Sequence, residues 1–321
     1  MPFVASGTYG CVFSPALQCA NKKEEEKKKK QKDTVSKVFR NQVSFEAEKK
    51  LESIIEIIDP KRTFTRPVYD NCAIVVNKKN ASQHYEKCEH IHMEGQNPKY
   101  SQLVYKDGGN DLSNILSHKM TEIQFKKLIK TIEPLILGIK KIHKHGYVHL
   151  DIKPGNILHD FKKSYLIDFG LMTLTTKTYQ KTHYLSYDYP YYPPEFKAAI
   201  GQSKGQSYEE FVSKFLLNFK YSSHVTHSAF EEYLNYTILE QKKDLQALYK
   251  ASNIETYTDK IDIYSLGVVL MSIYVYGYNL NFKIIPTEFT KIIKGMVCFN
   301  PKKRLSIEDA LRDYHRMVLH L

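Results

Sequence analysis

The sequence contains no tryptophan, and none of its apolar runs approaches the roughly 20 residues that a membrane-spanning helix requires. Residues 1–7 contain neither a basic region nor an apolar stretch of signal-peptide length. The chain has 5 cysteines among 321 residues, an odd number, so a disulfide framework is not expected. Together these absences predict a protein of a cytosol-like compartment.

Acidic residues are fewer than basic ones, with 35 Asp and Glu against 47 Lys and Arg and a net charge of +12. Such an excess can favour nucleic acid, acidic lipid or an acidic protein partner. However, Lys, Ile, Asn and Tyr are abundant, as in AT-rich coding sequences. A solvated lysine surface therefore explains the charge better than nucleic-acid binding does. The length allows one large domain or two lobes that share an interface.

A polar cluster between two apolar runs is the most informative part of the chain. Asp151, Lys153 and Asn156 lie in a short turn-rich segment, and Asp168 follows a short apolar run. Two carboxylates, an amide and an ammonium suit chemistry on a phosphate, because they supply a base, oxygen ligands for Mg²⁺ and a cation. A lone Asp or Asn in a turn usually caps the backbone. Four such residues in this spacing favour the chemical interpretation.

The cluster resembles the catalytic loop H-R-D-x-x-x-x-N and the D-F-G element of eukaryotic-type protein kinases. Here the first reads His-Leu-Asp151 with Asn156, and the second reads Asp168-Phe-Gly. The resemblance implies an α+β bilobal protein-kinase fold. A small β-rich N-lobe that binds ATP is expected over residues 1–107, and a larger helical C-lobe over residues 108–321.

A glycine-containing stretch near the N-terminus is similar to the family's phosphate-covering loop, G-x-G-x-x-G-x-V. It reads Ala5-Ser-Gly7-Thr-Tyr-Gly10-Cys-Val12, so Ala5 replaces the first glycine. The resemblance implies that the backbone at Ala5, Gly7, Gly10 and Val12 covers the phosphates of ATP.

Lys37 lies in an alternating strand pattern and resembles the lysine of V-A-I-K, which reaches the α- and β-phosphates. Residues 45–58 have helical spacing and resemble the helix whose glutamate pairs with that lysine. At about 100° per residue, Glu48 lies closest to the apolar face of this helix. We therefore predict a Lys37–Glu48 pair, with Glu52 as the alternative.

Residues 106–111 resemble the hinge whose backbone would hold adenine, and Tyr105 is expected at the back of that pocket. A single helix is predicted over residues 125–145, with Pro134 in an early turn or at a kink.

Residues 171–192 look like an activation segment, but Leu150 replaces the arginine of H-R-D, which in the family meets a phosphorylated residue of that segment. The segment also lacks a clear threonine where the family contacts the catalytic aspartate, and Asp188 falls near that place. We predict activity that does not depend on phosphorylation of the segment's hydroxyl residues, which are Thr173, Thr175, Thr176, Thr178, Tyr179 and Thr182.

Glu195 and Arg304 resemble the pair that braces the peptide-binding platform of the family. An inserted segment of about residues 196–257 carries helical patterns at 208–219 and 230–249. Docking of a substrate or partner and plain structural padding are both open for it.

Residues 77–99 form a polar stretch between two expected strands and are interpreted as a loop insertion, with a zinc site as the alternative interpretation. The spacing fits no zinc pattern well, so incidental residues are expected. The candidate ligands are Cys72, His84, Cys88, His90 and His92.

The resemblance as a whole implies ATP-dependent phosphorylation of Ser and Thr hydroxyls on proteins, with ATP and Mg²⁺ as cofactors. Asp151 would be the base, Lys153 would neutralise the γ-phosphate, and Asn156 and Asp168 would hold Mg²⁺. Lys153 is typical of Ser/Thr kinases. Three alternatives stay open: a pseudokinase scaffold, a kinase of a non-protein substrate, and a basic nucleic-acid-binding protein with this fold.

Residues 6–17, with Cys19, resemble Ser/Thr kinases of large cytoplasmic DNA viruses. That resemblance implies a viral protein located in the host cytoplasm or the virion.

Overall fold

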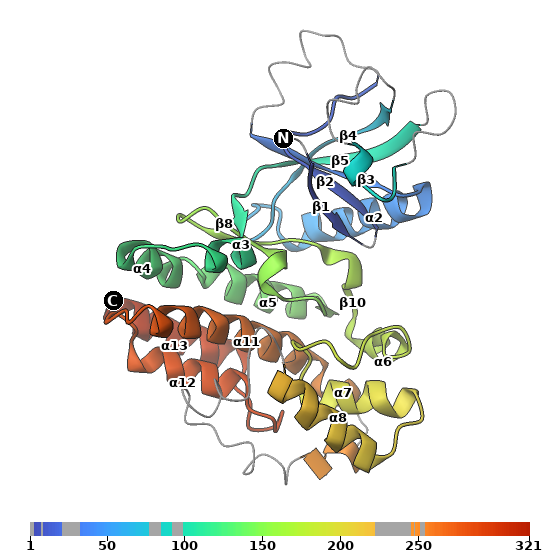
Figure 1. Ribbon diagram of the computed structural model, residues 1–321. Coiled ribbons are helices and arrows are strands. Elements are labelled where there is room, and N and C mark those ends of the chain that lie inside the picture. The colour runs from blue at the N-terminus through green and yellow to red at the C-terminus, as the bar shows by residue number, and fades with distance from the viewer. Residues whose placement is uncertain are drawn as a thin grey trace. The chain divides into compact units, whose positions relative to one another are not determined.

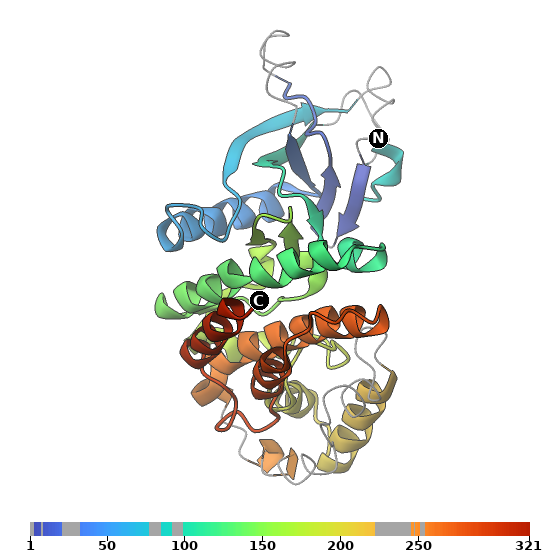
Figure 2. The same cartoon turned by 90° about the vertical axis from the view of Figure 1, so that its left-hand side faces the viewer.

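The computed structural model describes residues 3–7, 9–20, 33–76, 85–91, 99–221, 245–246, 248–250 and 254–321. The chain forms two compact units, Met1–Gly109 and Asn110–Leu321. Figures 1 and 2 show a β-rich first unit and a helical second unit. This is the α+β organisation predicted from the sequence, and the two units are described in turn.

The first unit contains a five-stranded antiparallel sheet with the order β1-β2-β3-β5-β4. Among the described residues of this unit, the sheet is accompanied by one α-helix and one short 3-10 helix. The bounds are β1 Phe3–Gly7, β2 Gly10–Phe13, β3 Thr34–Phe39, α2 Gln42–Ile58, β4 Val68–Val75, η2 Tyr85–Lys87 and β5 Lys99–Lys106.

One face of this sheet packs against α2. The cross-strand register places Val12 opposite Lys37 and Lys37 opposite Leu103, so these side chains share a face. Leu103 belongs to a buried cluster with Phe39 and with Phe45 of α2. The face that carries Lys37 is therefore the face that the helix covers.

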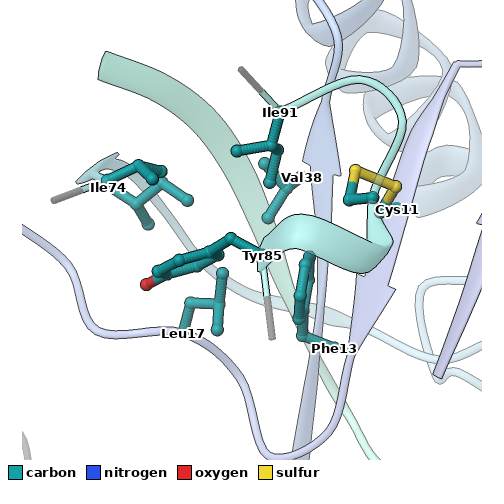
Figure 3. Close-up of a cluster of buried hydrophobic side chains, with 9 residues drawn as sticks. Cys11, Phe13, Leu17, Val38, Ile74, Tyr85 and Ile91 are labelled. Atoms are coloured by element: carbon teal, nitrogen blue, oxygen red, sulfur yellow. A yellow bond between two sulfur atoms is a disulfide. The ribbon is translucent and has the colours of Figure 1, made fainter. Parts of the chain in front are cut away.

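The opposite face of the sheet is buried by residues that follow β2 and by the segment around η2. Figure 3 shows Phe13 and Val38 of the sheet against Tyr85 and Ile91, with the Cys11 disulfide at the edge of the cluster. Tyr85 is 2% exposed, and the rings of Phe13 and Tyr85 meet edge to face. This second layer gives the small unit a core on both sides of its sheet.

Two disulfides cross-link this second layer, which contradicts the prediction that no disulfide framework would form. Cys11 bonds to Cys88, and Cys19 bonds to Cys72, whereas Cys298 is free. The partners are 77 and 53 residues apart, so neighbouring sequence carried no sign of the pairing. The sulfurs of Cys72 and Cys88 are also no longer thiolates that could bind zinc. His84 and His92 lie outside the described residues.

The second unit consists of helices with two small antiparallel sheets, β6-β8-β9 and β7-β10. Its strands are β6 Asn110–Asp111, β7 Tyr147–Val148, β8 Ile157–His159, β9 Ser164–Leu166 and β10 Thr173–Leu174. Its α-helices are α3 Leu112–Ser117, α4 Glu122–Lys130, α5 Glu133–Lys144, α6 Thr178–Lys181, α7 Pro194–Ser203, α8 Tyr208–Tyr221, α11 Thr258–Asn279, α12 Thr287–Met296 and α13 Ile307–Leu319. The 3-10 turns are η3 Pro154–Asn156, η4 Phe169–Leu171, η5 Thr175–Lys177 and η6 Ile254–Tyr257.

Helix α11 is the buried centre of the second unit, where it packs against α12, α5 and β7 (Figure 1). A Cβ at Gly267 would lie 2.7 Å from the Cβ of Met296, so the glycine allows α11 and α12 to approach closely. Within the described part of the chain, α11 is the one helix long and apolar enough to cross a membrane, and 72% of its apolar window is buried inside the unit. Its apolar composition is therefore explained by its place in the core.

The single helix predicted over residues 125–145 is instead two helices, α4 and α5. Pro134 lies in the first turn of α5, where its missing N–H breaks no helical hydrogen bond. Helix α4 therefore ends at Lys130, and α5 begins after Ile132. The apolar spacing continued across this break, which is why it indicated one helix.

The first helical pattern of the insert is present as α8, at residues 208–221. The second pattern, at residues 230–249, lies largely outside the described residues.

Reduction of the two disulfides is expected to lower the free energy of unfolding of the first unit by about 2–4 kcal/mol for each bond. A thermal melt with and without dithiothreitol measures this. The Cys298→Ser protein should show the same shift, because Cys298 is free. An unchanged melting midpoint together with four newly titratable thiols would contradict the expectation.

Candidate active site

The loop between β7 and β8 is anchored by Asp262 of α11. The backbone N–H groups of His149 and Leu150 donate to the Asp262 carboxylate at 2.8 and 3.0 Å, and His143 Nε2 lies 3.0 Å from it. Burial alone would raise the pKa of Asp262, but the hydrogen bond and charge of His143 and the bonds to the loop outweigh it and lower that pKa. The core helix therefore holds the loop through an ionised, fully buried carboxylate.

Leu150 occupies an unusual position in this loop. It is fully buried and has a φ of +64°, a left-handed backbone conformation that leucine rarely adopts. Its N–H bond to Asp262 fixes that conformation. An apolar side chain buried here provides no positive charge for a phosphate on the activation segment.

The Asp151 carboxylate accepts hydrogen bonds from three side chains. Lys153 Nζ lies 3.2 Å from Oδ1 and 3.0 Å from Oδ2, and Asn156 Nδ2 donates to Oδ2 at 2.7 Å. Tyr189 donates its hydroxyl to Oδ1 at 2.6 Å. Asp151 is 8% exposed, so this is a nearly buried carboxylate with a full set of donors.

Two histidine contacts shape the same loop. The Asp151 N–H donates to His149 Nδ1 at 3.2 Å, and the His149 ring packs 5.0 Å from the ring of Phe169. Burial lowers the pKa of His149, so its ring is neutral and can accept that bond. His149 therefore has a structural role in this loop.

Asp168 lies on the neighbouring segment, two residues after the end of β9. It has a left-handed φ of +59° and precedes the turn η4. The Ile167 N–H donates to the Asn156 carbonyl at 3.0 Å, which joins this segment to the Asp151 loop. The structure thus brings together within the second unit the four residues predicted for the chemistry there.

The donor set of Asn156 and Asp168 fits a magnesium ion. The amide nitrogen of Asn156 donates to Asp151, which leaves its amide oxygen for another partner. An amide oxygen and a carboxylate are the hard ligands that Mg²⁺ prefers, with phosphate oxygens and water completing its shell. Of the described residues, no group of three or more His, Cys, Asp or Glu side chains could hold a metal ion.

The predicted Lys37–Glu48 pair is present in the first unit. Lys37 Nζ lies 2.9 Å from Glu48 Oε1, and the two side chains are 16% and 9% exposed. Glu52, the alternative, lies one turn further along α2 and 3.8 Å from Arg62. Tyr105 is opposite Val35 in the sheet and therefore lies on the Lys37 face, as does Val12.

The β1–β2 hairpin contains the predicted phosphate loop, in which Gly7 pairs with Gly10 and Ala5 with Val12. A Cβ at Gly10 would overlap the carbonyl of Val38, so only glycine fits there.

The segment that carries η2 contacts the same hairpin. His90 Nε2 lies 2.7 Å from the Gly7 carbonyl oxygen, and the Ser6 hydroxyl donates to Glu89 at 3.2 Å. With the Cys11–Cys88 bond, these contacts tie residues 88–90 to the hairpin.

Glu195 and Arg304 form a two-bond ion pair inside the second unit. Arg304 Nη2 donates to Glu195 Oε2 at 2.9 Å, and the Arg304 guanidinium lies 5.0 Å from the centre of the Tyr264 ring. Both charged side chains are buried. The pair joins the start of α7 to the segment before α13, which is a structural role.

Sequence reasoning missed Tyr189 as a partner of Asp151. It pointed instead to Asp188, which is exposed and whose N–H donates to Ser186. The only sign in the sequence was the absence of the threonine whose hydroxyl, in the family, contacts the catalytic aspartate. Tyr189 supplies the hydroxyl from one residue further along.

The protein kinase domain family model matches residues 4–212. The chain belongs to the protein kinase family. The predicted α+β kinase fold is thereby confirmed. The match spans both the hairpin with Lys37 in the first unit and the Asp151 loop in the second.

Several curated protein kinases resemble parts of this kinase. Cell division control protein 2 homolog 2 of Trypanosoma brucei brucei is 39% identical over 71 residues, 22% of this chain and 21% of the relative. Dual specificity protein kinase zakA of Dictyostelium discoideum is 36% identical over 88 residues, which are 27% of this chain and 11% of the relative. Serine/threonine-protein kinase CBK1 of Saccharomyces cerevisiae is 50% identical over 50 residues, which are 15% of this chain and 7% of the relative. The chain therefore spans a minor part of each relative's length.

Glu52 of this kinase is expected to make stability depend on pH. Burial, with the charge of Glu48, raises its pKa to about 7 against the opposing effect of Arg62. A raised carboxyl pKa means that ionisation opposes folding, so the free energy of unfolding should fall as pH rises from about 4.5 to 7. Glu52→Gln removes this effect and should stabilise the protein at pH 8 by up to about 3 kcal/mol.

Urea unfolding of both proteins at pH 5 and pH 8 measures the difference. The control is Glu46→Gln, because Glu46 is exposed on the same helix. Equal pH dependence in the Glu52→Gln and Glu46→Gln proteins would refute the prediction.

Proposed function

We propose that this protein kinase transfers the γ-phosphoryl group of ATP to Ser and Thr hydroxyls on proteins. The observation that carries the proposal is the Asp151 carboxylate, held by Lys153 and Asn156 on a loop that a buried aspartate anchors. Phosphoryl transfer requires mainly positioning and charge neutralisation, and this loop supplies both.

Each residue has a role in the proposal. Asp151 orients the acceptor hydroxyl and takes its proton, while the Lys153 ammonium neutralises charge on the transferred group. Asn156 and Asp168 hold Mg²⁺, which when bound neutralises phosphate charge.

The first unit contributes the remaining nucleotide contacts. Lys37, oriented by Glu48, pairs with the α- and β-phosphates. The hairpin backbone at Gly7 and Gly10 lies over the phosphates, and Tyr105 lies at the back of the adenine pocket.

Three observations support a Ser/Thr-specific enzyme that acts on proteins. Lys153 is typical of Ser/Thr kinases, and several relatives carry serine/threonine-protein kinase in their names. The Glu195–Arg304 pair is formed, and in the family it braces the platform for a peptide. These observations favour a peptide over a small-molecule acceptor.

A pseudokinase scaffold is the second candidate. Ala5 in place of a glycine and Leu150 in place of an arginine favour it. Lys37, Asp151, Asn156 and Asp168 are all present, which favours catalysis more strongly.

The cellular setting is part of the proposal. A viral protein of the host cytoplasm or virion is supported by the resemblance of residues 6–17. Disulfides are uncommon in reducing cytosol. Thiol trapping in intact cells, followed by mass spectrometry, measures whether Cys11, Cys19, Cys72 and Cys88 are bonded in the cell. Disulfides that form only after lysis would indicate a reducing compartment such as the host cytoplasm.

Asp151→Asn is expected to reduce phosphoryl transfer at least a hundredfold, because general-base and positioning contributions are lost. Transfer from radiolabelled ATP with Mg²⁺ to generic basic and acidic proteins measures this. The matched control is Asp160→Asn, an aspartate in the turn after β8 whose side chain bonds only backbone N–H groups among the contacts described. Failure of the unmodified protein to bind ATP at all would favour the scaffold.

Removal of phosphate from the activation segment is expected to leave kcat unchanged, because buried Leu150 offers no charge to anchor a phosphate. Phosphatase-treated and untreated proteins should transfer label at equal rates, with mass spectrometry of residues 171–192 to verify removal. A loss of transfer that rephosphorylation restores would show dependence on phosphorylation.

A further inference from the structure

The hydrogen bonds to Asp151 occupy its whole accepting capacity. A carboxylate has about four lone-pair sites. Oδ1 accepts from Tyr189 and Lys153, and Oδ2 accepts from Asn156 and Lys153. An acceptor hydroxyl can therefore bind Asp151 only after one of these donors leaves.

Two of the three donor residues have other work in the proposed reaction. Lys153 must face the transferred phosphoryl group, and Asn156 must face the metal ion. When both turn to these partners, Oδ2 is released for an acceptor hydroxyl. Tyr189 has no such second task, so its bond to Oδ1 is the one that can persist through the reaction.

Tyr189 is built to act as this donor. Its ring lies 4.6 Å from the Tyr192 ring and 5.3 Å from the Tyr191 ring, and the Lys153 ammonium lies 5.8 Å from its centre. Burial and the neighbouring Asp151 charge raise the pKa of Tyr189 far above its ordinary value. The phenol is therefore protonated at any physiological pH and can only donate to the carboxylate.

The inserted segment fixes the chain on the N-terminal side of Tyr189. Tyr187 is 5% exposed, and its hydroxyl donates to the Phe211 carbonyl of α8 at 2.8 Å. The buried Lys197 ammonium of α7 lies between the rings of Tyr187 and Phe215, 5.7 and 5.8 Å from their centres. Lys204, at the end of α7, donates to the Leu185 carbonyl at 2.9 Å. Helices α7 and α8 thus hold residues 185–187 without a phosphate.

We propose that Tyr189 is a positioning residue that holds the Asp151 carboxylate in its working orientation, and that Tyr187, whose hydroxyl bonds to α8, holds Tyr189 in place. This brace of Tyr187 and Tyr189 replaces the phosphate anchor that Leu150 cannot provide. The inference rests on the proposed phosphoryl transfer. It also gives the first part of the insert a specific task, which is to support the segment next to the catalytic loop.

Steady-state kinetics of Tyr189→Phe test the proposal, because this variant keeps the ring and removes only the hydroxyl. We expect kcat to fall about tenfold or more, since a hydrogen bond to a charged group is lost. KM for ATP and for the protein acceptor should change less than twofold, because neither binds the phenol. Tyr184→Phe is the matched control, since Tyr184 is 87% exposed on the same segment.

A double-mutant cycle separates positioning from general support of the fold. In an Asp151→Asn background, Tyr189→Phe should cause no further loss, because the oriented carboxylate is already absent. The same fold-loss in both backgrounds would overturn the proposal, as would an unchanged kcat. A rise in kcat would also overturn it, by showing that Tyr189 obstructs Asp151.

Tyr187→Phe removes the hydroxyl that bonds to α8, and it can be measured even if Tyr189→Phe does not fold. We expect kcat to fall again with KM unchanged, and an unaltered kcat would remove α8 from the proposal. No transfer by the unmodified protein would refute the proposed function and this inference with it. Transfer by the unmodified protein with equal kcat in Tyr189→Phe would refute only the inference.

Discussion

The loop between β7 and β8 of this kinase depends on one buried carboxylate, Asp262 of α11. Its Oδ2 meets donors from His149 and His143, and its Oδ1 meets the N–H of Leu150. Because donors face both oxygens, asparagine would place an amide N–H against another donor at this site. The left-handed backbone of Leu150, and through it the direction of Asp151, follows from this contact with the core helix.

The two units are stabilised by different means. The small first unit has a core on both faces of one sheet, and its outer layer is cross-linked by two disulfides. Small units bury a limited fraction of their surface, and covalent links offset that limit. The second unit has a long buried helix and buried charged groups such as Asp262 and the Glu195–Arg304 pair, but among its described residues it has no disulfide.

Much of the site could be predicted from the sequence, because its parts are local. Asp151, Lys153 and Asn156 lie within six residues, and the apolar face of one helix was enough to choose Glu48 over Glu52. The disulfides and the Tyr189 contact could not be predicted. Cys11 meets Cys88 across 77 residues, and Tyr189 meets Asp151 across 38, so only the folded chain brings them together.

The links between residues 88–90 and the β1–β2 hairpin affect the thermodynamics of binding. One covalent bond through Cys11, with polar contacts at Ser6 and Gly7, removes conformational entropy from the hairpin when the protein folds. A nucleotide bound as proposed would meet hairpin strands that are already linked to residues 88–90, so less entropy would be lost on association. In this kinase the disulfide between Cys11 and Cys88 thus contributes to the preorganisation of the β1–β2 hairpin.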